Sequence, residues 1–390
     1  MNCCLVCGQP ACVPLVDFGR LPISHHFYDG TQEEFRQPMV LGQCTHCAQA
    51  QLLTIAPSEV LVPRYDWLVN NEPEAHLDEL VAALCRLPGI TKSARVCGIS
   101  HKDDSTLRRF REGGFTDTRR LDLGLRNPRA GVETVQQKLK PELASGLGKF
   151  DLVIARHILE HTHNPRLFMQ AIRGLVGPEG YIVCEIPDCA RPFELLDYTA
   201  LWEEHSLYFS AATLCQCLNA GGFRIEAIHN YPAPYETAIV AVARVATSVD
   251  VPLETRQERE RVRSFAEGFH GRRQLLRTLL SGHRHAGKIA LFGAGHHASM
   301  FTNLLGVADL IEFVVDDNPH KRGLRMPGTR LPIVGSDRLM TGEIRLCLSS
   351  LGAGSEQEVL AKLRSFIDSG GRFASVFPTT TDEPLTFRTE

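Results

Sequence analysis

The sequence of 390 residues lacks several features that would place the protein in a membrane or on a nucleic acid. No run of about 18 apolar residues occurs, so no membrane-spanning helix is expected. The first residues, MNCCLVCGQP, contain neither a basic nor an apolar stretch, so no secretory signal is expected. The net charge of −3 gives no basic excess, which argues against binding to nucleic acid or to a membrane surface. We therefore expect a cytoplasmic protein.

The composition is that of a globular protein with more than one domain. Hydrophobic residues make up 43% of the chain and charged residues 22%. Since a domain typically has about 150 residues, the length predicts two or three domains. The sequence contains 13 cysteines. Without a secretory signal, these cysteines are expected to be thiols or metal ligands and not a disulfide framework.

Two C-x-x-C pairs near the N-terminus predict a metal site. Cys4 and Cys7 form the first pair, and Cys44 and Cys47 form the second. Each pair presents two thiolates to one ion, and two pairs complete a tetrahedral zinc site. Gly8 suits the tight turn that such a knuckle makes. Unrelated buried or redox cysteines are the alternative. Because four ligands fill the coordination sphere, the predicted zinc is structural.

The middle of the sequence alternates between short apolar segments and segments of helical spacing. The expected strands are 94–99, 119–123, 150–155, 181–186 and 238–245. The expected helices are 76–87, 105–113, 164–175 and 211–220. This alternation predicts a doubly wound parallel sheet, in which ligands bind beyond the carboxyl ends of the strands.

The loop after the first of these strands is unusual for a nucleotide-binding loop. It reads Gly98-Ile-Ser-His-Lys-Asp-Asp-Ser-Thr and contains a single glycine, whereas such loops generally need several so that the backbone can approach the ligand. Asp122 lies near the end of the next expected strand, 119–123. At this position an acidic residue would hold the ribose hydroxyls of a bound nucleotide. The alternative for Asp122 is a turn residue or a helix cap.

The C-terminal part predicts a second Rossmann-like domain. A charge-rich amphipathic segment, 253–280, is expected to form a linker helix that packs within the chain. The strand 288–292 then runs into Gly293-Ala-Gly295-His-His-Ala298, a G-x-G-x-x-A turn of the dinucleotide type. The same turn also occurs in scaffolds without a ligand, so we do not infer NAD. The predicted parts are a zinc-binding domain at 1–72, a central α/β domain at 73–250, a linker helix at 251–285 and a C-terminal Rossmann-like domain at 286–390.

The order of these motifs resembles the sugar C-methyltransferase family over nearly the whole chain. The strings that carry the resemblance are CLVCG (4–8), DFGRLP (17–22), LGQCTHC (41–47), FDLVIARHILEH (150–161), EIP (185–187), EHSLYFS (204–210), FVVDDNPHK (313–321) and MPGT (326–329). The resemblance implies an α/β protein with an N-terminal zinc-knuckle domain, a central Rossmann-like methyltransferase domain and a C-terminal Rossmann-like α/β domain.

The family also implies a reaction. S-adenosylmethionine would donate a methyl group to a carbon of a nucleotide-linked ketosugar or a related small natural-product intermediate. A base removes the proton beside the ketone, and the enolate carbon then attacks the methyl group. The family places a Glu-His pair near that carbon, which corresponds to Glu204 and His205. An imidazole titrates near neutral pH, and a neighbouring carboxylate can hold it. A polar loop pair without chemistry is the alternative.

Further roles follow from the same resemblance. The residues expected at the donor are Gly98, Ser100, Asp103, Asp122, Arg156 and His157. The residues expected at the substrate are Tyr65, Trp67, Trp202, Tyr208, Asn318, His320 and Lys321. His157 and His161 are four residues apart, but no third metal ligand is evident beside them, so we interpret Glu160 and His161 as local structural hydrogen bonding.

The sequence departs from the family in loops that would face the ligands. Gly98 stands where the family has an acid, and residues 100–103 replace a glycine-containing turn. Trp202 replaces a tyrosine, and residues 233–237 replace a Gly-Gly-Ser string. Two alternatives therefore stay open. One is a divergent homologue with an altered acceptor or reaction, and the other is a non-catalytic protein that binds a nucleotide or a partner. A nucleic-acid-binding zinc ribbon is disfavoured, because no interleaved basic and aromatic residues flank the cysteines.

Overall fold

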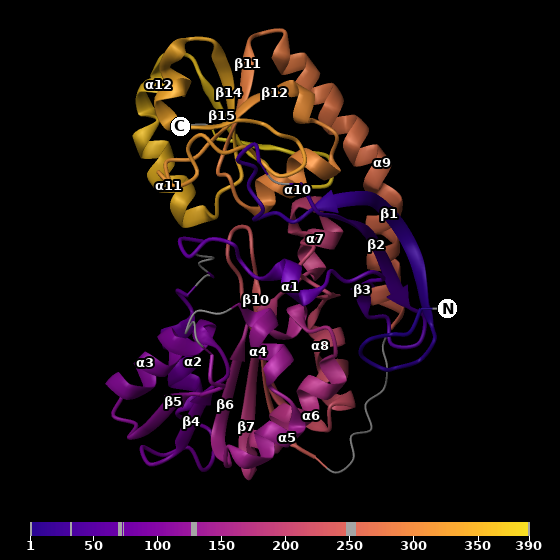
Figure 1. Ribbon diagram of the computed structural model, residues 1–390, viewed down its shortest axis with the longest axis vertical. Coiled ribbons are helices and arrows are strands. Elements are labelled where there is room, and N and C mark those ends of the chain that lie inside the picture. The colour runs from indigo at the N-terminus through magenta and orange to yellow at the C-terminus, as the bar shows by residue number, and fades with distance from the viewer. Residues whose placement is uncertain are drawn as a thin grey trace.

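The computed structural model describes residues 2–31, 33–68, 72, 74–125, 131–246 and 255–388. These residues form three sheets. The central sheet and the C-terminal sheet lie one above the other along the long axis, and the N-terminal sheet lies beside them (Figure 1). The predicted boundary between residues 250 and 251 lies outside the described residues. No helix in the described ranges combines the length and the apolarity that a membrane span requires.

The N-terminal sheet is antiparallel and has the order β1-β2-β3-β8. Its strands are β1 (Cys12–Pro22), β2 (Arg36–Cys44), β3 (Ala50–Leu52) and β8 (Leu207–Tyr208). The short helix α1 (Ser58–Leu61) follows β3. Because β8 comes from the middle of the chain, the N-terminal sheet contains the segment that directly follows His205.

The central sheet has the order β5-β4-β6-β7-β10-β9. Its strands are β4 (Arg95–Gly98), β5 (Asp117–Arg120), β6 (Phe150–Arg156), β7 (Val176–Pro187), β9 (Phe223–Tyr231) and β10 (Ala238–Val245). Strands β5, β4, β6 and β7 are parallel, and β10 is antiparallel to both neighbours. The carboxyl ends of the parallel strands therefore meet at one edge, as the alternating pattern predicts.

Helices cover both faces of the central sheet. One face packs against α2 (Leu77–Leu84) and α3 (Asp104–Glu112). The other face carries α4 (Val132–Lys138), α5 (Pro141–Gly146), α6 (Pro165–Leu175) and α8 (Ala211–Ala220). Short helical turns occupy the loops, namely η1 (His101–Asp103), η2 (Leu159–His161), η3 (Tyr198–Ala200) and α7 (Ala190–Glu194).

The third sheet has the order β13-β12-β11-β14-β15-β16, in which only β16 is antiparallel to its neighbour. Its strands are β11 (Lys288–Phe292), β12 (Ile311–Val315), β13 (Ile333–Val334), β14 (Ile344–Ser349), β15 (Arg372–Ser375) and β16 (Thr386–Phe387). Its helical segments are α10 (His296–Leu304), η4 (Ala308–Leu310), η5 (Ser336–Thr341), α11 (Ala353–Lys362) and α12 (Arg364–Asp368).

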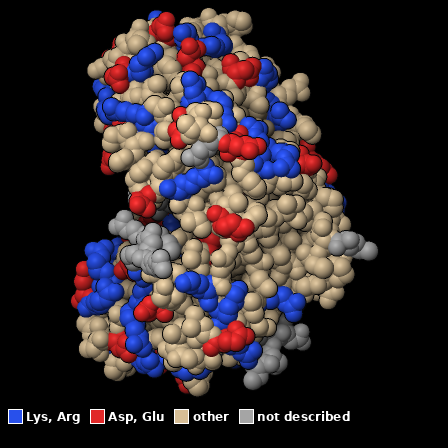
Figure 2. Space-filling model, in the orientation of Figure 1, with Lys and Arg blue, Asp and Glu red and all other residues tan. Residues whose placement is uncertain are grey.

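The linker helix α9 (Arg256–Arg284) runs along the side of the molecule from the N-terminal sheet to the C-terminal sheet (Figure 1). Its apolar residues, including Val262, Phe265, Phe269, Leu276 and Leu280, are buried in a core shared with both. Figure 2 shows Lys and Arg interspersed with Asp and Glu over the visible face, which fits the absence of a basic excess.

Candidate functional site

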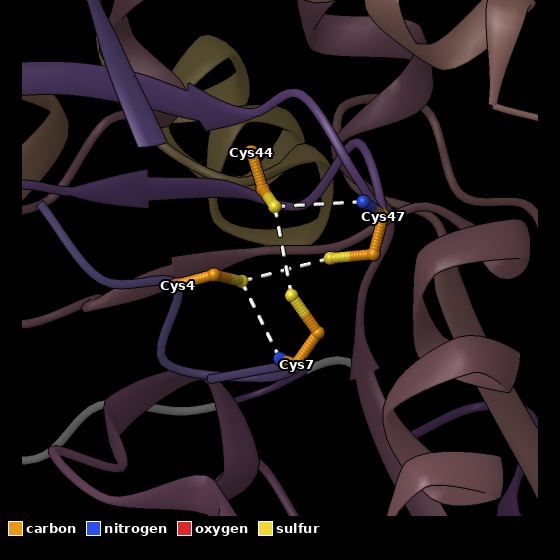
Figure 3. Close-up of side chains that lie close together, drawn as sticks. All are labelled: Cys4, Cys7, Cys44 and Cys47. Atoms are coloured by element: carbon orange, nitrogen blue, oxygen red, sulfur yellow. Dashed lines mark hydrogen bonds between the residues drawn. The ribbon is translucent and has the colours of Figure 1, made fainter. Parts of the chain in front are cut away.

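The four predicted zinc ligands converge on one point (Figure 3). Cys4 Sγ lies 3.6 Å from Cys47 Sγ, and Cys7 Sγ lies 3.6 Å from Cys44 Sγ. A tetrahedral zinc ion about 2.3 Å from each sulfur sets the sulfur atoms roughly 3.8 Å apart, so the four thiols fit the ion. Gly8 has φ = +74°, a conformation that favours glycine and that closes the first turn.

The N-terminal sheet also holds the segment around His205. Strand β3 pairs with β8, and Gln49 Nε2 donates a hydrogen bond to the carbonyl oxygen of Tyr208. Ser24 Oγ donates to Glu203 Oε2 at 2.9 Å. Burial, together with neighbouring Glu204, raises the pKa of Glu203 to about 7. The zinc-bearing part of the chain therefore positions the proposed catalytic segment.

A cavity of about 310 Å³ lies beyond the carboxyl ends of β4 and β5, and we call it the first-loop cavity. It is lined by Ile99, Ser100, His101, Arg120, Leu121, Asp122, Leu123, Leu125 and Val135. Its position is the one at which a doubly wound sheet binds its ligand. Ser100 and Asp122 are the predicted donor residues that line it. Asp122 Oδ1 also accepts a hydrogen bond from the N–H of Gly124, so the turn role is present as well.

Gly98 and Asp103 hold the first loop from beneath. The Asp103 carboxylate accepts hydrogen bonds from the N–H groups of Ile99, Ser100 and Arg156, and its side chain is fully buried. A Cβ atom on Gly98 would lie 2.7 Å from Asp103 Cβ, so glycine permits this close packing. Both residues were predicted to contact the donor, and that remains a prediction beside these contacts within the protein.

Arg156 and His157 are fixed by one buried carboxylate. Glu185 accepts from Arg156 Nε at 2.7 Å and Nη2 at 3.1 Å, and its Oε1 lies 3.1 Å from both His157 Nε2 and His76 Nε2. Arg156 Nη1 donates to the carbonyl oxygen of Lys102. Burial opposes the charged form of His157, but nearby carboxylates, led by Glu72, hold its pKa well above the ordinary value. Arg156 therefore supports the first loop, and His157 faces a different cavity.

That second cavity, the central cavity, lies between the carboxyl edge of the central sheet and the C-terminal domain. Its ionisable lining residues include the carboxylates Glu72, Glu160, Asp188, Asp197 and Glu236. Its imidazoles are His157, His161, His205, His296 and His297. A neighbouring outer cavity of about 550 Å³ shares several of these residues and reaches the first turn of α11. An ion pair between Lys102 in η1 and Glu72 lies between the first-loop cavity and the central cavity.

His205 lines the central cavity, whereas Glu204 turns away from it. The His205 ring packs against the rings of His161 and Trp202, with ring centroids 4.6 Å and 4.9 Å away. Burial, with His161 and His296 nearby, holds the pKa of His205 well below its ordinary value, so the ring is neutral at pH 7. Glu204 instead lies 3.2 Å from His25 Nε2. The two adjacent side chains therefore serve different surroundings.

Of the predicted substrate residues, Trp202 lines the central cavity, where its ring stacks on His296 at 4.3 Å. Tyr208 is fully buried, and its hydroxyl bonds the backbone of Trp202. Tyr65 and Trp67 stack on each other at 4.8 Å, and Trp67 stacks on His320 at 5.5 Å. This aromatic stack joins the N-terminal segment to the C-terminal domain.

Asn318 and Lys321 serve the C-terminal turn itself. Lys321 Nζ donates to Asp316 Oδ2 at 2.8 Å and to the carbonyl oxygen of Ala294. The N–H of Ala294, within the G-x-G-x-x-A turn, donates to the same carboxylate, and Asn318 N–H donates to Asp316 Oδ1. Asp316 thus accepts hydrogen bonds from both the G-x-G-x-x-A turn and the segment that contains Asn318 and Lys321.

The sequence interpretation missed several residues of the central cavity. His296 and His297 lie inside the quoted C-terminal turn, but their side chains were given no role. Glu160 was interpreted as structural. Glu72 and Glu236 come from loops without a recognisable pattern, and only the fold brings them to His157.

Three family descriptions match consecutive parts of the chain. Residues 4–61 match a zinc binding domain, residues 74–228 a methyltransferase domain, and residues 227–378 a C-methyltransferase C-terminal domain. The three parts follow one another in the order expected from the sequence: a zinc-binding domain, a methyltransferase domain and a C-methyltransferase C-terminal domain. This confirms the predicted fold class and the predicted enzyme class, an S-adenosylmethionine-dependent C-methyltransferase with a zinc-binding N-terminal domain. A small-molecule substrate agrees with this class.

One relative is similar over most of the chain. C-methyltransferase NovU of Streptomyces niveus is 24% identical to this protein, and the match covers 96% of this chain and 95% of NovU. The solved 1,6-didemethyltoxoflavin-N1-methyltransferase of Burkholderia thailandensis is 18% identical, covers 44% of this chain and 79% of its own, and has a TM-score of 0.32. Magnesium protoporphyrin IX methyltransferase of Synechocystis is also 18% identical, with the same coverages and a TM-score of 0.28.

Proposed function

We propose that this C-methyltransferase binds S-adenosylmethionine in the first-loop cavity and methylates a carbon beside the ketone of a nucleotide-linked ketosugar in the central cavity. The observation that carries the proposal is that segments following strands of the central sheet line both cavities: Ile99 after β4 lines the first-loop cavity, and His157 after β6 lines the central cavity. Methyl transfer requires a donor and an acceptor in adjoining spaces, since the attacking carbon and the methyl group must be held in line.

His205 is the proposed base. Its neutral imidazole accepts the proton from the carbon beside the ketone, and the electron pair of that C–H bond moves into the enolate. The enolate carbon then forms a bond to the methyl group as the carbon–sulfur bond of the donor breaks and S-adenosylhomocysteine leaves. The first step needs an unprotonated base, and the neutral imidazole of His205 lines the central cavity, where the acceptor would lie.

The outer cavity supports a nucleotide-linked acceptor. Gly352, Ala353, Gly354 and Ser355, at the start of α11, line it. The first N–H groups of a helix lack partners within the helix and favour an anionic group such as a diphosphate. Its volume of about 550 Å³ is within the range of small-molecule sites. The sugar would then lie inward, toward His205.

The test combines product analysis with isotope exchange. Purified protein is incubated with methyl-labelled S-adenosylmethionine and a nucleoside-diphosphate ketosugar, and NMR determines whether the label is bonded to carbon. In D2O without the donor, the wild-type protein should exchange the proton beside the ketone, and His205→Gln should not. Label on oxygen, or exchange that persists in His205→Gln, would contradict the proposal.

A further inference from the structure

We propose that Glu72, His157 and Glu236 form a binding site for one divalent cation in the central cavity. Their ligand atoms all lie within 4.8 Å of one another, and His157 Nδ1 is 3.9 Å from Glu72 Oε2. An ion about 2.1 Å from each ligand brings ligand atoms to within about 4.2 Å of each other, so small side-chain adjustments complete the site. The sequence offered no third ligand beside His157, and the fold supplies two from distant loops.

His157 is oriented as a metal ligand would be. Its Nε2 faces the buried Glu185 Oε1 at 3.1 Å, and its backbone N–H donates to the Glu185 carbonyl oxygen. Metal-binding histidines commonly donate one ring N–H to a carboxylate, which directs the lone pair of the other nitrogen to the ion. His157 also has φ = +46°, a conformation that is uncommon for residues other than glycine and that concentrates at functional sites.

Glu160 provides an independent indication of a missing cation. Its side chain is almost fully buried and lines the central cavity, and its Oε2 has no hydrogen-bond partner. Its Oε1 lies 3.5 Å from His157 Nδ1, on the side of the ring that faces the proposed site. An unpaired buried carboxylate oxygen is costly, and a cation in the central cavity would offset the negative charge of Glu160.

The central cavity has a lining rich in carboxylates, which favours a bound cation. Five carboxylates line it, and its described lining residues include neither lysine nor arginine. The nearby ammonium of Lys102 contacts Glu72 Oε1, whereas the oxygen that faces His157 is Oε2. A cation at the proposed site would use Glu72 Oε2, the oxygen nearest His157, while Oε1 keeps its contact with Lys102.

The mixed carboxylate and imidazole ligands suit Mn²⁺, Fe²⁺ or Zn²⁺. The role of the ion rests on the proposed function: beside the ketone it would polarise the carbonyl oxygen and stabilise the negative charge of the enolate.

Mn²⁺ is the probe for the test. Protein that retains its knuckle zinc is titrated with Mn²⁺, without donor or acceptor, and electron paramagnetic resonance measures the free ion. We expect one Mn²⁺ per chain in the wild type, and at least tenfold weaker binding in Glu72→Gln and in Glu236→Gln. Pulsed measurements on the bound ion should show coupling to an imidazole nitrogen.

The matched control is Glu79→Gln, which removes the same charge from an exposed position on α2 and should bind Mn²⁺ like the wild type. Thermal unfolding establishes that each variant is folded. Absence of saturable binding, equal affinity in all four proteins, or a bound ion without nitrogen coupling would overturn the site. Because no substrate is present, failure here leaves the methyl-transfer proposal standing, and failure of methyl transfer leaves the site standing.

Discussion

The first-loop cavity and the central cavity lie at the same edge of the central sheet, but they are assembled differently. The first-loop cavity comes mainly from two short segments that follow β4 and β5, and it has few ionisable groups. The central cavity collects carboxylates and imidazoles from loops throughout the chain. The sheet topology therefore fixes the position of the first-loop cavity, whereas packing between distant parts of the chain assembles the ionisable groups of the central cavity.

The largest expected effect is the loss of turnover in His205→Gln, a variant that should change kcat without changing donor binding. His205→Gln removes the proposed base from the central cavity and leaves the first-loop cavity intact. General-base catalysis contributes about 10²- to 10⁴-fold, so we expect kcat to fall by that factor while the affinity for S-adenosylmethionine stays within about twofold. Steady-state kinetics and calorimetry measure the two quantities. A parallel loss of donor affinity would indicate a structural role for His205.

The second prediction concerns Glu185, the buried carboxylate that contacts both Arg156 and His157. Glu185 is buried and pairs with Arg156 beneath the first loop and with His157 in the central cavity. Removing one partner of a buried ion pair generally costs about 3–5 kcal/mol, so Glu185→Gln should destabilise the fold by an amount of that order. Urea unfolding measures it. The control Glu179→Gln removes an exposed partner of Arg244 and should cause no measurable change. Equal effects would mean that Glu185 is not the shared anchor.

The third prediction concerns loss of the zinc ion, which should disturb the central cavity near His205 more than the first-loop cavity. Cys44→Ser should release the zinc and loosen β3, which pairs with β8 next to His205. We expect turnover to fall at least about tenfold while donor binding persists, because the first-loop cavity has no residue from the N-terminal sheet among those described. Elemental analysis, kinetics and calorimetry provide the readouts, with Cys3→Ser as the exposed control. Normal turnover without zinc would contradict this coupling.

The smallest expected effect lies in the first-loop cavity. Asp122→Asn keeps the shape of the side chain but weakens its hydrogen bonds to ribose hydroxyls. A hydrogen bond to a charged group contributes about 1.5–3 kcal/mol, so donor affinity should fall by about tenfold or more with kcat at saturation nearly unchanged. Asp117→Asn, at the other end of β5, is the control. If both variants bind the donor like the wild type, Asp122 acts only in its turn.

The two cavities also differ in how far the sequence could predict them. The cysteine ligands follow from local spacing, and the linker helix, predicted at 251–285, is observed as Arg256–Arg284. Strand β5 begins and ends two to three residues earlier than predicted, because Leu121 to Leu123 already belong to the loop. These features depend on short-range patterns that remain visible in one sequence.

The central cavity could not be predicted in the same way. Glu204 and His205 are adjacent in the sequence, but Glu204 turns to His25, a contact that exists only once the N-terminal domain is packed. Glu72 and Glu236 approach His157 only in the folded chain. Gly98 suggests a donor contact, yet its packing against Asp103 is what the fold requires. Long-range packing decides these roles, and no local spacing encodes it.

Calorimetric titration with S-adenosylmethionine tests the central claim most directly. The account predicts saturable binding of one donor per chain to the wild-type protein, binding of S-adenosylhomocysteine at the same site, and weaker binding of both to Asp122→Asn. Absence of heat and of any competition between the two compounds, in protein that carries its zinc and unfolds cooperatively, would contradict the account.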